Sequence, residues 1–278
     1  MRQLDPGAWT PHWPLLLASS AVLLVGYFTT GYLWGRIVAG LGGPRLPVAV
    51  SIRLFMIANL GRYVPGKVWQ IAGLAALART RGVPATTAAA SAVLGQGIAL
   101  ASATLVGLGA VWTLADGAGW RWAVPLVLFG TMIAGLFPPV FDAVCARWFR
   151  LAKTQPPEAL RSRDAIGWLA IGLASWLVYA TAFWLLVRSF GLDAAFLPTA
   201  SAFAAAYVLG YVMVFAPAGI GVREGALVAL LSPQIGAAAA GAVALIARLW
   251  TTLVEVVPAA AFWTRHLATA PAASRPRD

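Results

Sequence analysis

The stretch Asn59–Gln70 reads NLGRYVPGKVWQ, with apolar sequence on both sides of it. Proline donates no backbone hydrogen bond and disfavours helix at the residue before it, while glycine lets the chain turn at little steric cost. We therefore expect one helix to end before Pro65 and another to begin near Lys67. The start of a helix carries unpaired N–H groups with partial positive charge. Flanked by Arg62 and Lys67, this helix start is expected to attract an anion.

A second stretch with the same features lies towards the other end of the chain. Residues Phe215–Gly225 read FAPAGIGVREG and combine a proline, glycines and a cation in the first turn of an apolar helix. Pro65–Gly66 lies about as far from the N-terminus as Pro217–Gly219 lies from the C-terminus. Paired segments interrupted by Gly and Pro in the two halves of a membrane protein point to its binding site.

We expect the two interruptions to line a shared polar cavity, because irregular backbone at bilayer depth persists only inside protein or beside water. The alternative is that both are ordinary loops whose cations face the cytoplasm. Apolar residues close to each turn argue against this alternative, namely Val64, Val68, Phe215, Ile220 and Val222.

The composition of the chain is that of a membrane protein. Of its 278 residues, 60% are hydrophobic and 10% are charged, and the mean hydropathy is +0.80. A soluble domain is roughly 45–50% apolar and about 25% charged. The apolar excess therefore indicates surface that faces lipid, and it excludes a soluble enzyme, a secreted disulfide scaffold and a disordered tail as descriptions of the whole chain.

Apolar stretches long enough to cross a membrane predict the architecture. Six of them reach the roughly 20 residues that a spanning helix needs, and they are Leu15–Ile37, Pro84–Leu114, Trp120–Val140, Ala165–Phe190, Phe196–Phe215 and Gly236–Trp263. Two further stretches, Val48–Leu77 and Val222–Leu231, are broken or short. We predict an all-α fold, a polytopic transmembrane helical bundle with six long spans and two Pro/Gly-interrupted segments. No linker marks a second domain, so residues 1–278 form one integral-membrane domain with short polar termini at 1–12 and 266–278.

The charge balance predicts the topology. A formal net charge of +11 indicates a positive-inside bias, and some cations are also candidates for binding lipid head groups. No nucleic-acid partner is expected, because no soluble domain remains to carry such a surface. The basic loop at 142–164 and the basic C-terminal tail are predicted to be cytoplasmic, and Arg2 places the N-terminus there too. This N-in, C-in arrangement requires both interrupted stretches to cross; the alternative is a pair of re-entrant hairpins that do not cross.

Two charged residues, Arg248 and Glu255, lie inside the last long span. They are two helical turns apart on one face, and a charge that faces lipid costs several kcal/mol, so both are expected to face the protein interior. Arg248 is expected to pair with Glu224 or a phosphate, and Glu255 with Arg62 or Arg223. A structural ion pair and a role in substrate or proton coupling both stay open.

The candidate substrate-binding residues come from the two interruptions and the last span. They are Arg62, Tyr63, Pro65, Gly66, Lys67, Gly219, Gly221, Arg223, Glu224, Arg248 and Glu255. Tyr207 and Tyr211 share a helix face that leads to the second interruption, where cavity lining and simple packing are equally compatible with their positions. Gln96 is expected to make a hydrogen bond between helices.

The sequence shows no pattern that predicts catalysis or metal binding. The single cysteine, Cys145, excludes an internal disulfide and a multi-cysteine metal site, and His12 and His266 stand near opposite ends of the chain. The chain contains no Walker loop, HExxH or GxSxG motif. We therefore expect no catalytic residues, no metal and no cofactor, and we expect the protein not to be an enzyme.

Both interruptions resemble motifs of a known family. Over Gly61–Trp69 and Ala216–Gly225 the chain is similar to the flippase-like domain family, also called the lysylphosphatidylglycerol synthase transmembrane region. The matching positions are Arg62, Pro65, Gly66, Lys67, Pro217, Gly219, Gly221, Arg223 and Glu224. The resemblance extends from the first span to the last, and it implies an all-helical, multi-pass bundle in the bacterial inner membrane.

This resemblance also implies a range of functions. In the multiple peptide resistance factors, the best-known members, the domain moves an aminoacylated phospholipid between leaflets. Other members accompany glycosyltransferases or isoprenoid and hopanoid metabolism. The large soluble aminoacyl-transferase domain of the fused synthases is absent from these 278 residues, so the resemblance implies no lysyl transfer.

The leading functional hypothesis is lipid translocation. A head-group phosphate would bind near Pro65–Lys67, held by Arg62 and Lys67, and Arg223 would serve the equivalent site at the second interruption. One alternative is an ion-coupled small-solute secondary transporter built around Arg248 and Glu255. Another is a non-transporting membrane partner of a lipid-modifying enzyme or glycosyltransferase.

Overall fold

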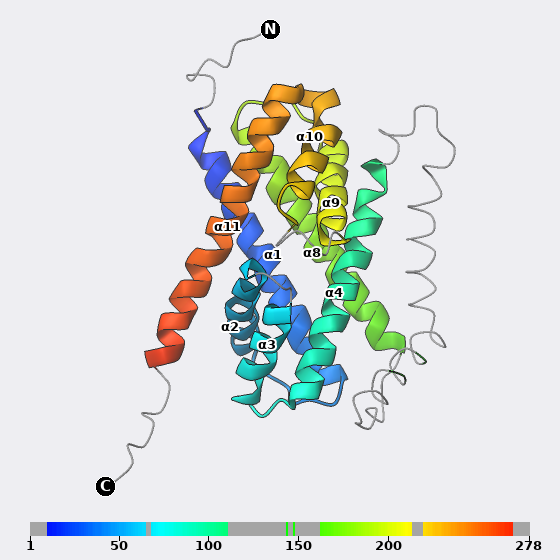
Figure 1. The fold of residues 1–278 in the computed structure, drawn as a ribbon, viewed down its shortest axis with the longest axis vertical. Coiled ribbons are helices and arrows are strands. Elements are labelled where there is room, and N and C mark those ends of the chain that lie inside the picture. The colour runs from blue at the N-terminus through cyan, green and yellow to red at the C-terminus, as the bar shows by residue number, and fades with distance from the viewer. Residues whose placement is uncertain are drawn as a thin grey trace.

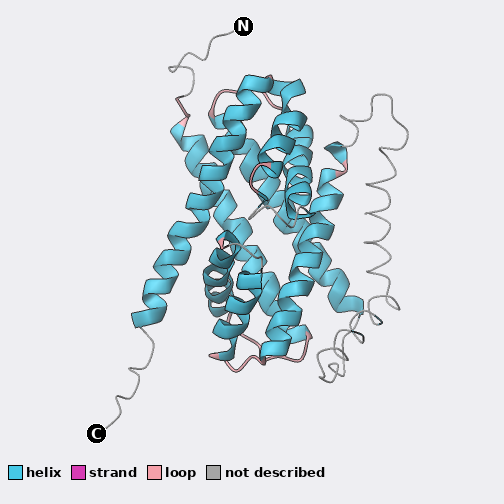
Figure 2. Ribbon diagram, in the orientation of Figure 1, coloured by secondary structure: helices cyan, strands magenta, loops and turns pink. Residues whose placement is uncertain are grey.

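A computed structural model describes residues 10–64, 68–110, 143, 147, 162–212 and 219–268 of the chain. Every regular element in these ranges is a helix, and they pack as one elongated bundle (Figures 1 and 2). The all-α prediction is therefore confirmed for the part of the chain that is described. The predicted span at 120–140 lies outside these residues, as does most of the basic loop at 142–164.

Four helices are long and apolar enough to cross a membrane. They are α1 (Trp13–Gly40), α4 (Ala85–Gly107), α8 (Ser162–Ser189) and α11 (Ala237–Ala268). Each corresponds to one of the six stretches predicted from the sequence. These four helices form the frame around which the shorter helices are arranged (Figure 1).

The first interrupted segment forms a hairpin of short helices. Helix α2 (Val48–Asn59) leads into the 3-10 turn η2 (Leu60–Tyr63), and α3 (Val68–Arg79) runs back beside α2 towards the same end of the bundle (Figure 1). The break therefore falls where the proline and glycines predict it. A Cβ atom added at Gly61 would lie 2.7 Å from the backbone nitrogen of Gln70, so glycine allows the two arms to approach closely.

The second interrupted segment forms a similar hairpin from the opposite end. Helix α9 (Phe196–Val212) descends to the middle of the bundle and α10 (Val222–Ile235) returns upward (Figure 1). The sequence predicted a full span over Phe196–Phe215, but α9 has 17 residues and ends within the bundle. Apolar residues continue towards the second interruption, so composition alone cannot distinguish a helix that stops in the middle of the bundle from one that crosses it.

The ends of the described chain differ from the predicted topology. Helix α1 begins at the upper end of the bundle and α11 finishes at the lower end (Figure 1), whereas the sequence placed both on the cytoplasmic side. The physical reason is that each interrupted segment returns to the end it came from. The re-entrant alternative therefore describes the two segments, and crossing does not.

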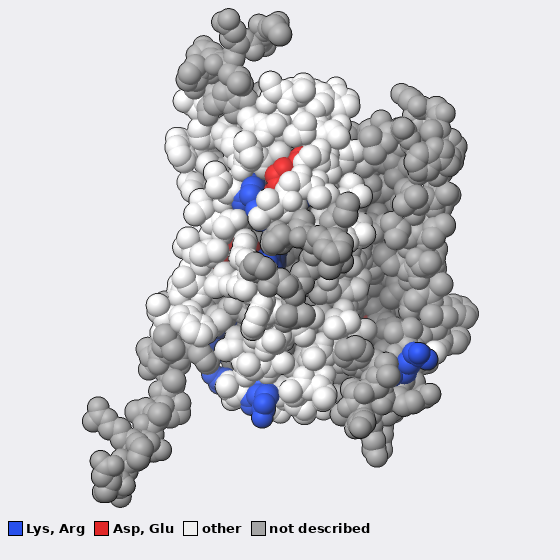
Figure 3. All heavy atoms as spheres, in the orientation of Figure 1, with Lys and Arg blue, Asp and Glu red and all other residues white. Residues whose placement is uncertain are grey.

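Helix α11 shows how a spanning helix separates its faces. Leu245, Leu249, Leu253 and Val257 are each more than 60% exposed and repeat every four residues, which forms an apolar stripe on the outside. Glu255 lies on the inner side and is 1% exposed. Charged atoms are sparse on the face that Figure 3 shows: a blue and red pair lies at α10 and α11, and Lys and Arg atoms lie near the lower edge.

Candidate functional site: a cavity between two helical hairpins

A cavity lies where the turns of the two hairpins meet the long helices. It contains about 190 Å³ of space that water can occupy, against roughly 10–15 Å³ for one water molecule. Arg62 and Tyr63 reach it from the first hairpin, and Gly219 and Arg223 reach it from the second. The expectation that the two interruptions line one cavity is therefore confirmed.

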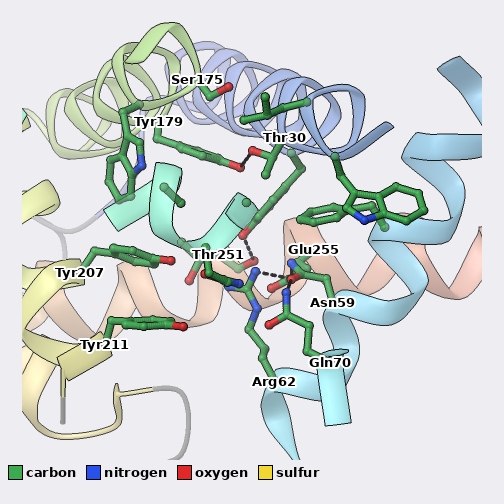
Figure 4. Close-up of a pocket in the computed structure, with 18 of the residues that line it drawn as sticks. Thr30, Asn59, Arg62, Gln70, Ser175, Tyr179, Tyr207, Tyr211, Thr251 and Glu255 are labelled. Carbon is green, nitrogen blue, oxygen red and sulfur yellow. Dashed lines mark hydrogen bonds and ion pairs between the residues drawn. The ribbon is translucent and has the colours of Figure 1, made fainter. Parts of the chain in front are cut away.

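Glu255 is the centre of a buried polar cluster on one wall of the cavity (Figure 4). The Arg62 guanidinium lies 3.1 Å from its Oε1 atom, and the Tyr63 hydroxyl donates to its Oε2 atom over 2.7 Å. The Asn59 amide donates to Oε1, and the Gln70 amide in turn donates to Asn59 over 2.6 Å. Three donors thus converge on one carboxylate, which is the condition for a charge to be stable away from water.

Sequence reasoning missed two members of this cluster, Asn59 and Gln70. Both stand in the quoted stretch around the first interruption, and both are polar amides in otherwise apolar helices. Polar side chains within membrane segments commonly face the bundle interior and bind one another. That signal was available, but only the fold shows that these residues hold Glu255, which is far away in sequence.

A second ion pair joins α10 to α11. Glu224 Oε1 lies 3.8 Å from the Arg248 guanidinium, and its Oε2 accepts a hydrogen bond of 2.7 Å from the backbone N–H of Gly221. Glu224 thus accepts from one backbone N–H at the start of α10 and places a carboxylate there, at a helix start that the sequence treated as open to an anion. Gly221 has φ 85°, a backbone conformation that favours glycine.

Arg223 differs from the other two arginines of the cavity. Its guanidinium lies over the Phe203 ring, 4.9 Å from the ring centroid. Among the residues that the structure describes, no carboxylate forms an ion pair with it. A cation held this way keeps its donors available for an anionic ligand.

Aromatic side chains form the wall of the cavity opposite the polar cluster around Glu255 (Figure 4). Tyr207 packs edge-on against Trp176 at 4.8 Å and stacks on Tyr211 at 6.1 Å, centroid to centroid. The Tyr179 hydroxyl is hydrogen-bonded to that of Thr30 over 2.8 Å. Tyr207 and Tyr211 therefore line the cavity. Of the two interpretations left open by the sequence, cavity lining and simple packing, the structure supports cavity lining.

The predicted residues divide into three groups. Arg62, Tyr63, Gly219, Arg223, Arg248 and Glu255 line the cavity. Gly221 and Glu224 do not line it, but they shape the start of α10 beside it. Pro65, Gly66 and Lys67 lie outside the described residues.

Both pairings expected for the last span occur, Arg248 with Glu224 and Glu255 with Arg62. Gln96 borders the cavity, and its amide oxygen is buried without a hydrogen-bond partner, so the expected bond between helices is not made at that atom. Over the described ranges, no group of three His, Cys, Asp or Glu side chains is placed to hold a metal ion.

Apolar helices long enough to span a membrane, two helical hairpins and a charged cavity between them are the features of a multi-pass membrane protein. The family model for the lysylphosphatidylglycerol synthase TM region matches residues 2–259. The chain therefore belongs to this family, as its two motifs indicated. Neither the curated proteins nor the solved structures contain a significant match to it.

Proposed function

We propose that this protein moves a lipid with a phosphate-bearing head group across the bacterial inner membrane, and that the head group binds in the cavity between the hairpins. The supporting observation is the position of Arg223. This cation lines the cavity and makes no ion pair with any described residue, whereas Arg62 and Arg248 each have a carboxylate partner. An entering anion would neutralise a charge for which the described residues provide no carboxylate partner.

Arg62 would then have a secondary role. The sequence made Arg62 a primary ligand of the phosphate, but its guanidinium is bound to Glu255 at 3.1 Å. A phosphate at Arg62 would have to share or displace that carboxylate. Competition of this kind would weaken binding enough to allow release on the other side, which transport requires.

The aromatic wall would complement the phosphate site. Hydroxyl groups of Tyr207 and Tyr211 are hydrogen-bond donors close to the second hairpin. They suit phosphate or glycerol oxygens, while the ring faces provide apolar surface for the adjoining part of the lipid. The sequence contains no nucleotide-binding motif, so transport would be downhill or coupled to an ion gradient, without catalysis.

The orientation follows from the positive-inside rule. The end of α1, the α1–α2 connection and the end of α3 meet at the lower end of the bundle (Figure 1), and they carry Arg36, Arg45, Arg79 and Arg81. The end of α8 at the upper end carries Arg188, which is paired with Asp193. We therefore place the lower end, with the end of α11, in the cytoplasm and the start of α1 outside.

Reconstitution into vesicles tests the proposal. A fluorescent phospholipid in the inner leaflet becomes accessible to an impermeant reductant only when it is flipped. We expect wild-type protein to flip it, and Arg223→Ala to slow flipping at least about tenfold through loss of a charge-assisted hydrogen bond. Arg188→Ala removes an arginine at the far end of the bundle and should keep the wild-type rate. Equal rates for wild type and Arg223→Ala would contradict the proposal.

A small anionic solute is the second candidate, and the modest cavity volume of about 190 Å³ favours it. In that case, uptake into vesicles would depend on an ion gradient and no lipid would move. A third role, as a non-transporting partner of a lipid-modifying enzyme or glycosyltransferase, rests on the family resemblance alone. It would predict that Arg223→Ala leaves the partner's activity intact.

A further inference from the structure

A second hollow lies at the lower end of the bundle, separate from the central cavity. The last turns of α1, the α1–α2 connection, the start of α2 and the first turns of α8 enclose it, with a volume of about 730 Å³. None of its lining residues belongs to the set that lines the central cavity. None of the described residues of the two family motifs lines it.

The charged residues of this hollow are not paired with one another. Arg36, Arg45 and Asp164 all line it. No ion pair links any of the three to a described residue, although the Arg36 guanidinium donates to the Tyr32 hydroxyl over 3.2 Å. Opposite charges that surround one space without touching leave room for a ligand that carries both signs.

Close contacts of two α1 glycines with side chains of the neighbouring helices give the hollow its shape. A Cβ atom at Gly35 would lie 2.3 Å from Ser51 Oγ, and one at Gly40 would lie 2.3 Å from the Trp168 ring. Glycine at these positions lets α2 and α8 approach α1 on either side of the hollow. Trp168 is buried, so the wall that it forms is fixed before any ligand arrives.

The hollow lies at the ends of two helices that are long enough to span a membrane, where the head-group layer is expected. It is located at the last turns of the spanning helix Trp13–Gly40 and at the first turns of the spanning helix Asp164–Ser189. Arg, Tyr and Trp are the side chains that stand at this depth. Val48 borders the hollow and is 52% exposed, so an acyl chain that leaves the hollow would meet apolar surface.

We propose that this hollow binds one phospholipid of the adjacent leaflet whose head group carries both a phosphate and an ammonium group. Arg36 and Arg45 hold the phosphate, and Asp164 accepts hydrogen bonds from the ammonium group. A head group with only negative charge leaves Asp164 unpaired beside its phosphate. A head group with quaternary nitrogen gives Asp164 no N–H donor. The preferred ligand is therefore a lipid of the ethanolamine type, and this site is independent of transport through the central cavity.

Native mass spectrometry of the purified full-length chain tests the assignment. The protein is incubated with mixed vesicles of phosphatidylethanolamine, phosphatidylglycerol and phosphatidylcholine in equal amounts, and bound lipid is counted. In the Arg223→Ala background, where the central cavity does not contribute, we expect one phosphatidylethanolamine per chain. Arg36→Ala with Arg45→Ala should reduce its occupancy at least about tenfold, and Arg36→Lys with Arg45→Lys should restore part of it. Asp164→Asn should remove the preference for phosphatidylethanolamine over phosphatidylglycerol.

Matched controls separate this site from other arginines. Arg79→Ala with Arg81→Ala removes two exposed arginines from the same end of the bundle, outside both hollows, and should leave occupancy unchanged. The counts are made in the Arg223→Ala background, so that lipid bound in the central cavity does not contribute and the result does not depend on the proposed transport. Three results would each overturn the assignment. They are unchanged occupancy in the variant with Arg36→Ala and Arg45→Ala, no selectivity among the three lipids, and displacement of the lipid by inorganic phosphate.

Discussion

Glu255 is buried in a spanning helix, and its neighbours explain why it is tolerated there. Arg62, Tyr63 and Asn59 all donate to its carboxylate, and Gln70 holds Asn59 in place. All four of these residues belong to the first hairpin, whereas Glu255 belongs to α11. The cluster therefore fastens the tip of a re-entrant hairpin to the frame of the bundle.

Removing one partner of this pair should cost more than removing both charges. Arg62→Ala leaves the carboxylate short of a cation, so we expect a loss of about 3 kcal/mol of stability. Arg62→Ala combined with Glu255→Gln should recover a large part of that loss, because no buried charge remains. Thermal unfolding in detergent measures the coupling between the two positions, and strictly additive losses would show that the ion pair does not contribute.

The hairpins depend on glycine at the points where their arms touch. Gly219 has φ 71°, and a Cβ atom there would lie 3.0 Å from both the Cα and the carbonyl oxygen of Gly210. The turn between α9 and α10 therefore needs both the backbone freedom and the small size of glycine. Arg223 also lies against Gly210. The position of Arg223 therefore depends on the close approach of the two arms at this turn.

Two alanine substitutions on this hairpin should have opposite effects. Gly219→Ala introduces strain and a steric clash, and we expect it to destabilise the protein by about 1–3 kcal/mol. Gly225→Ala lies within α10 with nothing within 4 Å of the added Cβ, so it should be neutral or raise stability by up to about 1 kcal/mol through helix propensity. Melting temperatures of the two variants in one detergent check this, and a stable Gly219→Ala would contradict the described turn.

Much of this helical organisation was predictable from local sequence. Pro65, Gly66, Pro217 and Gly219 mark both interruptions, and the long apolar runs mark the four spanning helices. That the described helix α9 reaches only the middle of the bundle was not predictable, because its apolar residues continue towards the interruption. The hydrogen bond from Asn59 to Glu255, which Gln70 supports through Asn59, joins distant segments. Local sequence patterns carry no information about such contacts.

The complete bundle holds two hairpins that enter from opposite ends and meet at one cavity (Figure 1). This arrangement brings the starts of α3 and α10 towards the middle of the bundle, where helix N-termini favour negative charge. It also differs from the predicted N-in, C-in arrangement, because the start of α1 and the end of α11 lie at opposite ends of the bundle. That prediction depended on Arg2, the only cation near the first span, and on counting each interrupted stretch as one crossing of the membrane.

The two ends of the chain should lie on opposite sides of the membrane. Reporter fusions that are active only in the cytoplasm or only outside it measure this directly. We expect a reporter after residue 268 and one in the 80–84 connection to report the cytoplasm, and a reporter before residue 13 to report the outside. Reporters at both ends on the same side would contradict the re-entrant arrangement.

Binding of a phosphate-bearing lipid to the central cavity is the claim on which the proposed function depends. Equilibrium binding of a short-chain phosphatidic acid tests it, in a background with Arg36→Ala and Arg45→Ala so that the lower hollow does not contribute. We predict saturable binding that weakens at least about tenfold with Arg223→Ala and is unchanged with Arg188→Ala. Equal affinity in the presence and absence of the Arg223 side chain would contradict the account.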